Sequence, residues 1–92
     1  MSKGELQKLQ EILEGENWLL DDTDGTSIMA GNIYKLKVEN GYLFAEMIKK
    51  TSLYGISTFK STTIAGFRRY EGGIHINTKS GAEFWFLEGQ NV

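Results

Sequence analysis

The sequence predicts an α+β fold, in which a short N-terminal helix precedes a strongly bent antiparallel β-meander of five to seven strands, arranged as a roll or half-barrel. Three observations predict this fold. Apolar residues near the start repeat at helical spacing, and those of the remaining chain alternate with polar ones. Tight turns between the alternating runs leave no room for crossover helices, so the strands should be antiparallel. The length of 92 residues suits a single domain, residues 1–92, with one core.

Residues 2–14 are expected to form the helix. Their apolar side chains fall on a single stripe, which consists of Leu6, Leu9, Ile12 and Leu13. Ser2 followed three residues later by Glu5 fits a capping box at the helix start. Gly15 is placed to end the helix with a positive φ angle. Because a helix of about three turns is marginal in isolation, it should pack against the sheet.

Residues 16–88 are expected to form the sheet, and residues 89–92 a frayed tail. Asn40-Gly41 lies between two alternating runs, residues 33–38 and 42–48, which is a strong hairpin signal. Further strands are expected at residues 18–20, 27–30, 53–60, 62–70, 74–78 and 82–87, with turns at residues 21–25, 71–73 and 79–81. Gly55 and Gly66 interrupt two of these runs and indicate bulges or bends.

Two of the predicted strands are apolar on both faces. Tyr42 and Phe44 lie on the face opposite Leu43 and Ala45, and Trp85 and Leu87 lie on the face opposite Phe84 and Phe86. A sheet with one solvated face would show polar residues opposite the core. The helix covers part of one face, so the other needs a curled sheet, a second copy or a partner. The candidate protein-interaction residues are Tyr42, Phe44, Trp85 and Leu87.

The charges are unevenly distributed, although the formal net charge is −2. Residues 1–24 carry seven acids and two lysines, whereas residues 25–92 carry eight bases and five acids. A basic and aromatic cluster in the second part is typical of sheets that hold single-stranded nucleic acid. The candidate anion-binding residues are Lys60, Arg68, Arg69 and Tyr70. Because Arg68 and Arg69 are adjacent on a strand, they should point to opposite faces and cannot share a patch.

The acidic segment Asp22-Thr23-Asp24-Gly25-Thr26 resembles the first motif of haloacid-dehalogenase-type phosphatases, which implies a parallel α/β fold and magnesium. The β-meander that follows here departs from that pattern. An EF-hand calcium loop starting at Asp22 would need a glutamate where Ile33 stands. His75, the single histidine, should lie on the strand face opposite Ile74 and Ile76. No family is therefore assigned, and no catalytic, cofactor-binding or metal-ligating residue is predicted.

The leading functional hypothesis is a small non-enzymatic interaction module that binds protein through a sheet face or an edge strand and associates with itself. One alternative is a binder of nucleic acid or another anionic partner. The second alternative is a small-ligand carrier or an enzyme that uses the interior of the curled sheet. The chain has no cysteine and no apolar run of the length of a signal peptide or membrane span. We therefore expect a cytoplasmic protein with no membrane partner and no cofactor.

Overall fold

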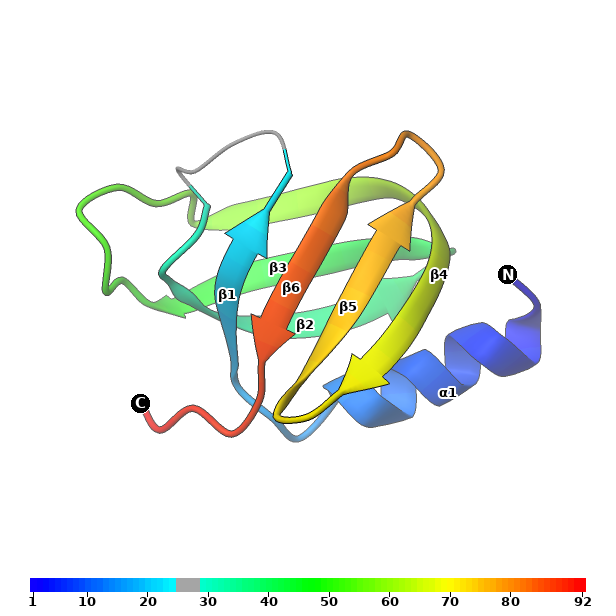
Figure 1. Ribbon diagram of the computed structural model, residues 1–92, viewed down its shortest axis with the longest axis horizontal. Coiled ribbons are helices and arrows are strands. Elements are labelled where there is room, and N and C mark those ends of the chain that lie inside the picture. Colours follow the sequence, from blue (N-terminus) through cyan, green and yellow to red (C-terminus); the bar gives the residue numbers. More distant parts are fainter. Residues whose placement is uncertain (25–28) are drawn as a thin grey trace.

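Residues 1–24 and 29–92 are described by the computed structural model and form one helix and six antiparallel strands, which close into a barrel (Figure 1). After helix α1 (Lys3–Leu13), the strands are β1 (Trp18–Thr23), β2 (Ile33–Glu39), β3 (Tyr42–Lys49), β4 (Thr58–Tyr70), β5 (Gly73–Thr78) and β6 (Glu83–Leu87). Each strand pairs with the next along the chain, and β1 also pairs with β6. The predicted α+β meander is confirmed, and its sheet closes fully.

Helix α1 has the predicted start and end. Ser2 and Glu5 form a capping box, in which the Glu5 backbone N–H donates to the Ser2 hydroxyl at 3.2 Å. Gly15 follows the helix with a φ of 83°. The helix lies across one end of the barrel, where Leu9 and Leu13 are fully buried in the same core as the strands (Figure 1). It therefore covers an open end of the barrel.

The bend of the sheet comes from the long strand β4. Its first half pairs with β3 and its second half with β5, and each pairing contains a bulge. Near Ser61 the register shifts, and the Ser61 hydroxyl accepts the Leu43 backbone N–H at 3.0 Å. The second shift, between Ile64 and Gly66, confirms the bulge predicted at Gly66. Bulges increase local twist and bend a strand, so β4 turns from one side of the barrel to the other.

The turn predictions that rest on asparagine and glycine are confirmed. Asn40 and Gly41 have φ angles of 53° and 81°, as the turn between β2 and β3 requires. Gly72 and Gly81, in the other two predicted hairpin turns, also have positive φ angles. In a hairpin, the turn determines which residues of the two strands pair. The register of β2 with β3, and of β5 with its neighbours, therefore depends on nearby residues.

The predicted strand at residues 53–60 is wrong over its first half, because β4 begins at Thr58 and continues through the predicted break before residue 62. Residues 50–57 form a loop around the buried side chain of Asn32. The Asn32 Oδ1 atom accepts the backbone N–H groups of Thr51 and Ser52, and its Nδ2 atom donates to the Tyr54 carbonyl. Backbone groups satisfied by a side chain do not join a strand ladder.

Two other predicted boundaries differ from the structure. The turn predicted at residues 21–25 starts later, because β1 continues to Thr23 and pairs Asp22 and Thr23 with β6. Residues 25–28 are outside the described residues, and with them most of the strand predicted at 27–30, while Met29 and Ala30 lie in a bend and a turn. In the C-terminal tail, Gln90 exchanges two hydrogen bonds with Asn17.

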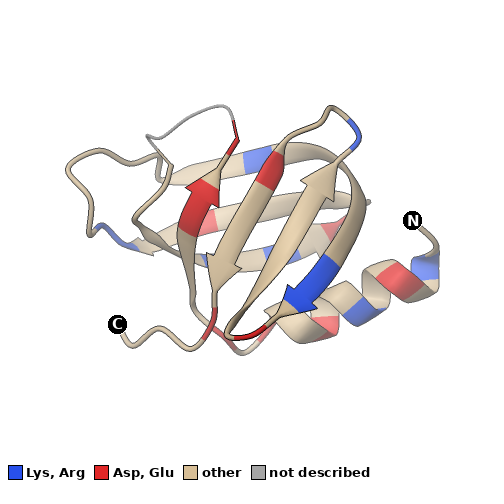
Figure 2. Cartoon of the chain, in the orientation of Figure 1, with Lys and Arg blue, Asp and Glu red and all other residues tan. Residues whose placement is uncertain are grey.

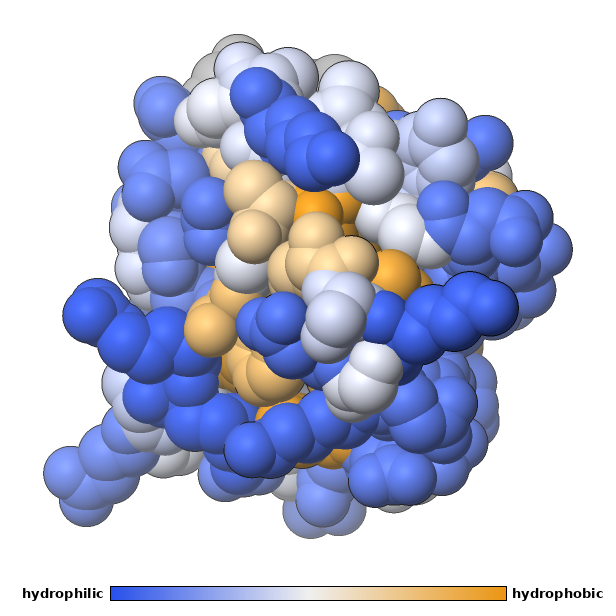
Figure 3. Space-filling model, turned by 90° about the vertical axis from the view of Figure 1, so that its right-hand side faces the viewer, coloured by the Kyte–Doolittle hydropathy of each residue, from blue (hydrophilic) through white to orange (hydrophobic). Residues whose placement is uncertain are grey.

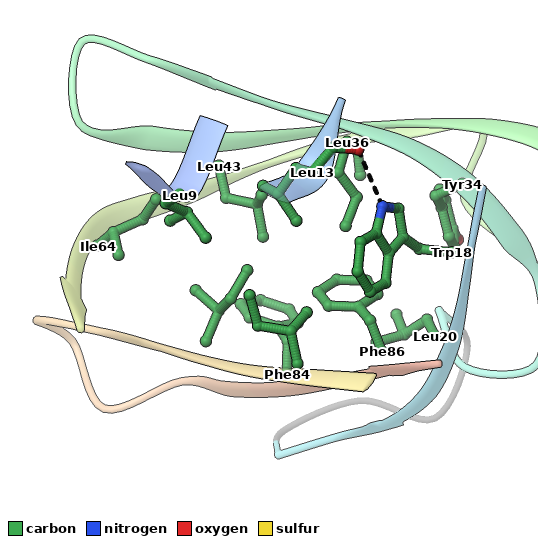
Figure 4. Close-up of a cluster of buried hydrophobic side chains, with 13 residues drawn as sticks. Leu9, Leu13, Trp18, Leu20, Tyr34, Leu36, Leu43, Ile64, Phe84 and Phe86 are labelled. Atoms are coloured by element: carbon green, nitrogen blue, oxygen red, sulfur yellow. Dashed lines mark hydrogen bonds between the residues drawn. The ribbon is translucent and has the colours of Figure 1, made fainter. Parts of the chain in front are cut away.

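Large apolar side chains from the helix and the strands fill the interior of the barrel (Figure 4). The indole of Trp18 is fully buried and donates to the Leu13 carbonyl at 3.0 Å, which joins the end of the helix to the first strand. Across the interior the ring centroids of Tyr34 and Phe59 lie 5.3 Å apart, and those of Phe59 and Phe84 lie 5.6 Å apart. The helix is therefore part of the core.

We predict that Leu13→Ala lowers the free energy of unfolding by about 2–5 kcal/mol, because it removes a fully buried side chain and leaves a cavity. Urea denaturation followed by tryptophan fluorescence measures this change. Lys8→Ala, at an exposed position of the same helix, should change stability by less than about 0.5 kcal/mol. Equal losses from both substitutions would contradict a core role for the helix.

Candidate functional site

The outer surface of β2, β3 and the first half of β4 carries two parallel rows of side chains that cross the strands. The strand registers place Lys37, Phe44 and Lys60 side by side in one row. The other row contains Lys35, Glu46 and Thr58. The sheet backbone between the rows belongs to Leu36, Ala45 and Phe59, whose side chains point into the barrel core. We call this surface the groove face.

A groove of about 580 Å³ runs along the groove face between the two rows. The end of α1 and the start of its connection to β1 also line the groove, through Leu13, Glu14, Gly15 and Glu16. Its charged lining residues are three lysines and three glutamates, so they balance: Lys35, Lys37, Lys60, Glu14, Glu16 and Glu46. The volume lies within the range of about 300–1,000 Å³ that is usual for small-ligand sites, and a protein segment can also fill such a groove.

Lysine side chains lie against the aromatic rings of the groove face. The Lys60 ammonium nitrogen is 4.2 Å from the ring centroid of Tyr42 and 5.3 Å from that of Phe44. Lys37 lies 5.5 Å from the same Phe44 ring and forms an ion pair of 3.2 Å with Glu39. Cation–π contacts of this kind hold flexible lysine side chains in place. The half-buried Phe44 ring and the lysines beside it therefore line the groove together.

The other two predicted interaction residues, Trp85 and Leu87, lie on the opposite side of the barrel. Strands β1, β5 and β6 face the viewer in Figure 1, with β2 and β3 behind them. The Trp85 and His75 rings stack at a centroid distance of 4.7 Å on the outer surface of β5 and β6. Leu87 pairs with Leu19 of β1. We call this surface the tryptophan face; it consists of Leu19, Arg68, Tyr70, His75, Trp85 and Leu87.

The predicted anion-binding residues do not form one patch. Lys60 belongs to the groove face, whereas Arg68 pairs with His75 on the tryptophan face. Arg69 follows Arg68 in the strand and therefore points to the other side of β4, where it forms an ion pair with Glu88 at 2.9 Å. Its guanidinium carbon also lies 6.0 Å from the ring centroid of Trp18. The four residues therefore do not form one contiguous anion-binding surface.

Tyr70 lies over Gly73, and its hydroxyl donates to the Phe86 carbonyl at 3.0 Å. A Cβ atom at Gly73 would lie 2.2 Å from that carbonyl oxygen and 2.6 Å from the tyrosine ring, so the position requires glycine. Burial raises the pKa of the Tyr70 phenol, and the negative charge of Asp21 raises it further. Tyr70 thus acts as a structural part of this face.

Tyr42, Phe44 and Lys60 were predicted as site residues from the sequence, whereas the neighbouring groove residues Lys35 and Lys37 were not. The Asn40-Gly41 turn sets the pairing of β2 with β3, so a hairpin register drawn from it places Lys37 opposite Phe44. No comparable signal exists for the lining residues Glu14 and Glu16, because their position depends on how α1 packs against the barrel.

Figure 2 shows acidic positions on β1 and β6 at the front and lysine positions on the strands behind them.

Within residues 1–24 and 29–92, no cluster of three histidine, aspartate or glutamate residues is arranged to hold a metal ion. Nor is any helix in this part of the chain long and apolar enough to cross a membrane. The sequence matches no protein-family model and no curated protein, and no solved structure matches the chain.

We predict that the stability of the folded state falls as the pH rises above about 10, and that Tyr70→Phe makes this fall less steep. A phenol with a raised pKa keeps its proton in the folded state at a pH where the unfolded chain has lost it. The folded state therefore binds more protons, and alkali favours unfolding. The variant should also lose about 1 kcal/mol at neutral pH with the hydrogen bond to Phe86. Urea denaturation between pH 7 and 11 measures both effects, and parallel pH profiles would contradict the prediction.

Proposed function

We propose that the protein is a non-enzymatic interaction module whose groove receives an extended segment of a protein partner. The observation that carries this proposal is the groove between the two cross-strand rows, with an aromatic wall at Phe44 and balanced charges around it. A few residues carry most of the binding energy at protein interfaces, and aromatic residues are enriched there. The aromatic ring and the mixed lysines and glutamates of the groove suit a chain that offers both apolar and charged side chains.

The balance of charge favours a protein segment over nucleic acid. Nucleic-acid affinity depends on pairing many phosphates with lysine or arginine. The groove is lined by as many glutamates as lysines, three of each, and Glu46 lies in the same row as Lys35. Arg68 and Arg69, the remaining bases of the predicted patch, lie on other surfaces. A polyanion along the groove would meet carboxylates as often as ammonium groups.

The barrel interior is a less suitable place for a ligand than the outer surface. Fully buried Trp18, Tyr34 and Phe86 occupy the space between α1 and the strands. The groove lies outside this core, over the backbone of the sheet. For a carrier or an enzyme that uses the interior, these side chains would have to move, at a cost of several kcal/mol for each large apolar group displaced.

A peptide selection tests the groove. Peptides selected from a random library on the immobilised protein should lose at least tenfold in affinity with Phe44→Ala, about 1.4 kcal/mol or more, because the variant removes the aromatic wall. Trp85→Ala is the matched control, since it truncates an aromatic residue on the opposite face. The proposal fails if Phe44→Ala binds like the parent. It fails equally if a single-stranded oligonucleotide binds tightly at ~50 mM salt through the groove.

We propose further that the protein associates with itself through the tryptophan face, where Leu19, Trp85 and Leu87 form a partly exposed apolar surface. Trp85→Lys should then weaken a dimer or larger species in sedimentation velocity, because it places a charge in the contact. Phe44→Lys on the groove face is the control and should leave the species unchanged. A monomer at every concentration would contradict self-association and would leave the peptide-binding proposal intact.

A further inference from the structure

A second groove lies at the end of the barrel beside the first turns of α1, and the groove face does not include it. Its volume is about 560 Å³. One side is the helix and the residue before its cap, through Met1, Lys3, Leu6, Gln7 and Gln10. The other side comes from Val38, Asn40 and Gly41 around the hairpin turn, from Thr63 and Ile64 of β4, and from Lys79. We call it the end groove.

Hydrogen bonds between distant segments hold the walls of the end groove in place. The Gln10 Oε1 atom accepts the Val38 backbone N–H at 2.6 Å, which fixes the helix to β2. The Gly41 carbonyl accepts the Ile64 N–H at 2.8 Å, which fixes the hairpin turn to β4. The Lys79 N–H donates to the Thr63 carbonyl, also at 2.8 Å. The groove is therefore formed before any ligand binds.

The end groove has an apolar floor and a hydrophilic rim. Leu6, Val38 and Met1 are partly exposed in it, and Ile64 is buried beneath them. Figure 3 views the molecule from this side and shows an apolar area surrounded by hydrophilic residues. An aliphatic chain laid on this floor would remove apolar surface from water on both partners, at about 25 cal/mol for each Å² covered.

The charge of the end groove differs from that of the groove on β2, β3 and β4. Among the described residues that line it, two are lysines, Lys3 and Lys79, and none is acidic. The other groove has three lysines against three glutamates. A ligand for the end groove should therefore carry negative charge as well as apolar surface, since lysine ammonium groups pair with carboxylates.

We propose that the end groove binds a monomeric amphiphilic anion, an aliphatic carboxylate whose chain lies on Leu6, Val38 and Ile64 and whose headgroup pairs with Lys3 or Lys79. This site is separate from the groove of the proposed function, and either can fail without the other. Together they make the protein an interaction module with a small-ligand site at one end of its barrel.

Titration with decanoate, below the concentration at which it forms micelles, tests the proposal by amide NMR and calorimetry. Decanoate should shift the amide signals of Val38, Gly41 and Ile64 and bind at least about tenfold more tightly than 1-decanol, which has the chain without the charge. Acetate, which has the charge without the chain, should produce no saturable shift. Equal binding of decanoate and 1-decanol, or shifts confined to other residues, would overturn the proposal.

Matched charge reversals complete the test. Lys3→Glu with Lys79→Glu should weaken decanoate binding by about tenfold or more, whereas Lys8→Glu with Lys50→Glu changes the net charge equally outside the groove and should leave it within about twofold. Lys3→Glu places an acid in the first turn of α1, which the helix dipole tolerates, so the variant should fold. Equal losses in both pairs would overturn the site. Binding to phosphatidylserine vesicles without binding of monomeric decanoate would do the same.

Discussion

The bend of β4 is the constraint on which the rest of the structure depends. This strand pairs with β3 through its first half and with β5 through its second, so the two sides of the barrel share one continuous backbone. The bulges near Ser61 and between Ile64 and Gly66 allow it to turn without losing either ladder. Without that turn, β6 could not reach β1, and the sheet would keep two open edges.

Barrel closure explains the position of the helix. Strands β1 and β2 share only a short ladder, at Trp18–Tyr34 and Leu19–Ile33, so the rest of β2 needs another partner on that side. Helix α1 supplies it, through the Gln10 side chain and the buried leucines of its apolar stripe. The hydrogen bond from Trp18 to Leu13 then joins the helix end to the barrel. Packing of this kind supplies the stability that a three-turn helix lacks by itself.

The same geometry creates the two grooves and makes them chemically different. In the groove on β2, β3 and β4, strand register brings three lysines and Glu46 together with Phe44, and the connection after α1 adds Glu14 and Glu16. The end groove follows from the seam between α1 and the barrel, where apolar side chains of both meet beside Lys3 and Lys79. The first suits a partner of mixed charge and the second an anion with an apolar chain. Each is assembled from segments that are distant in the sequence.

Local patterns in the sequence were enough to predict several features. The capping box at Ser2, the hairpin turn at Asn40-Gly41 and the bulge at Gly66 were confirmed, because each depends on neighbouring residues or on the freedom of glycine. Alternation also assigned the side chains of β3 and β6 to their faces, since a strand has a period of two. The apolar outer residues Tyr42, Phe44, Trp85 and Leu87 were found in this way.

Tertiary structure alone decided which outer residues become neighbours. Alternation grouped Phe44 with Trp85 as apolar residues on the second face of their strands, and barrel closure places them on opposite sides (Figure 1). A strand was predicted at residues 53–57, where the buried side chain of Asn32, more than twenty residues earlier in the chain, holds a loop instead. Alternation determines the face of a side chain, but neighbours across strands depend on register, bulges and closure. Register, bulges and closure depend on contacts between distant parts of the chain, and the hydrophobic pattern of a single segment holds no information about such contacts.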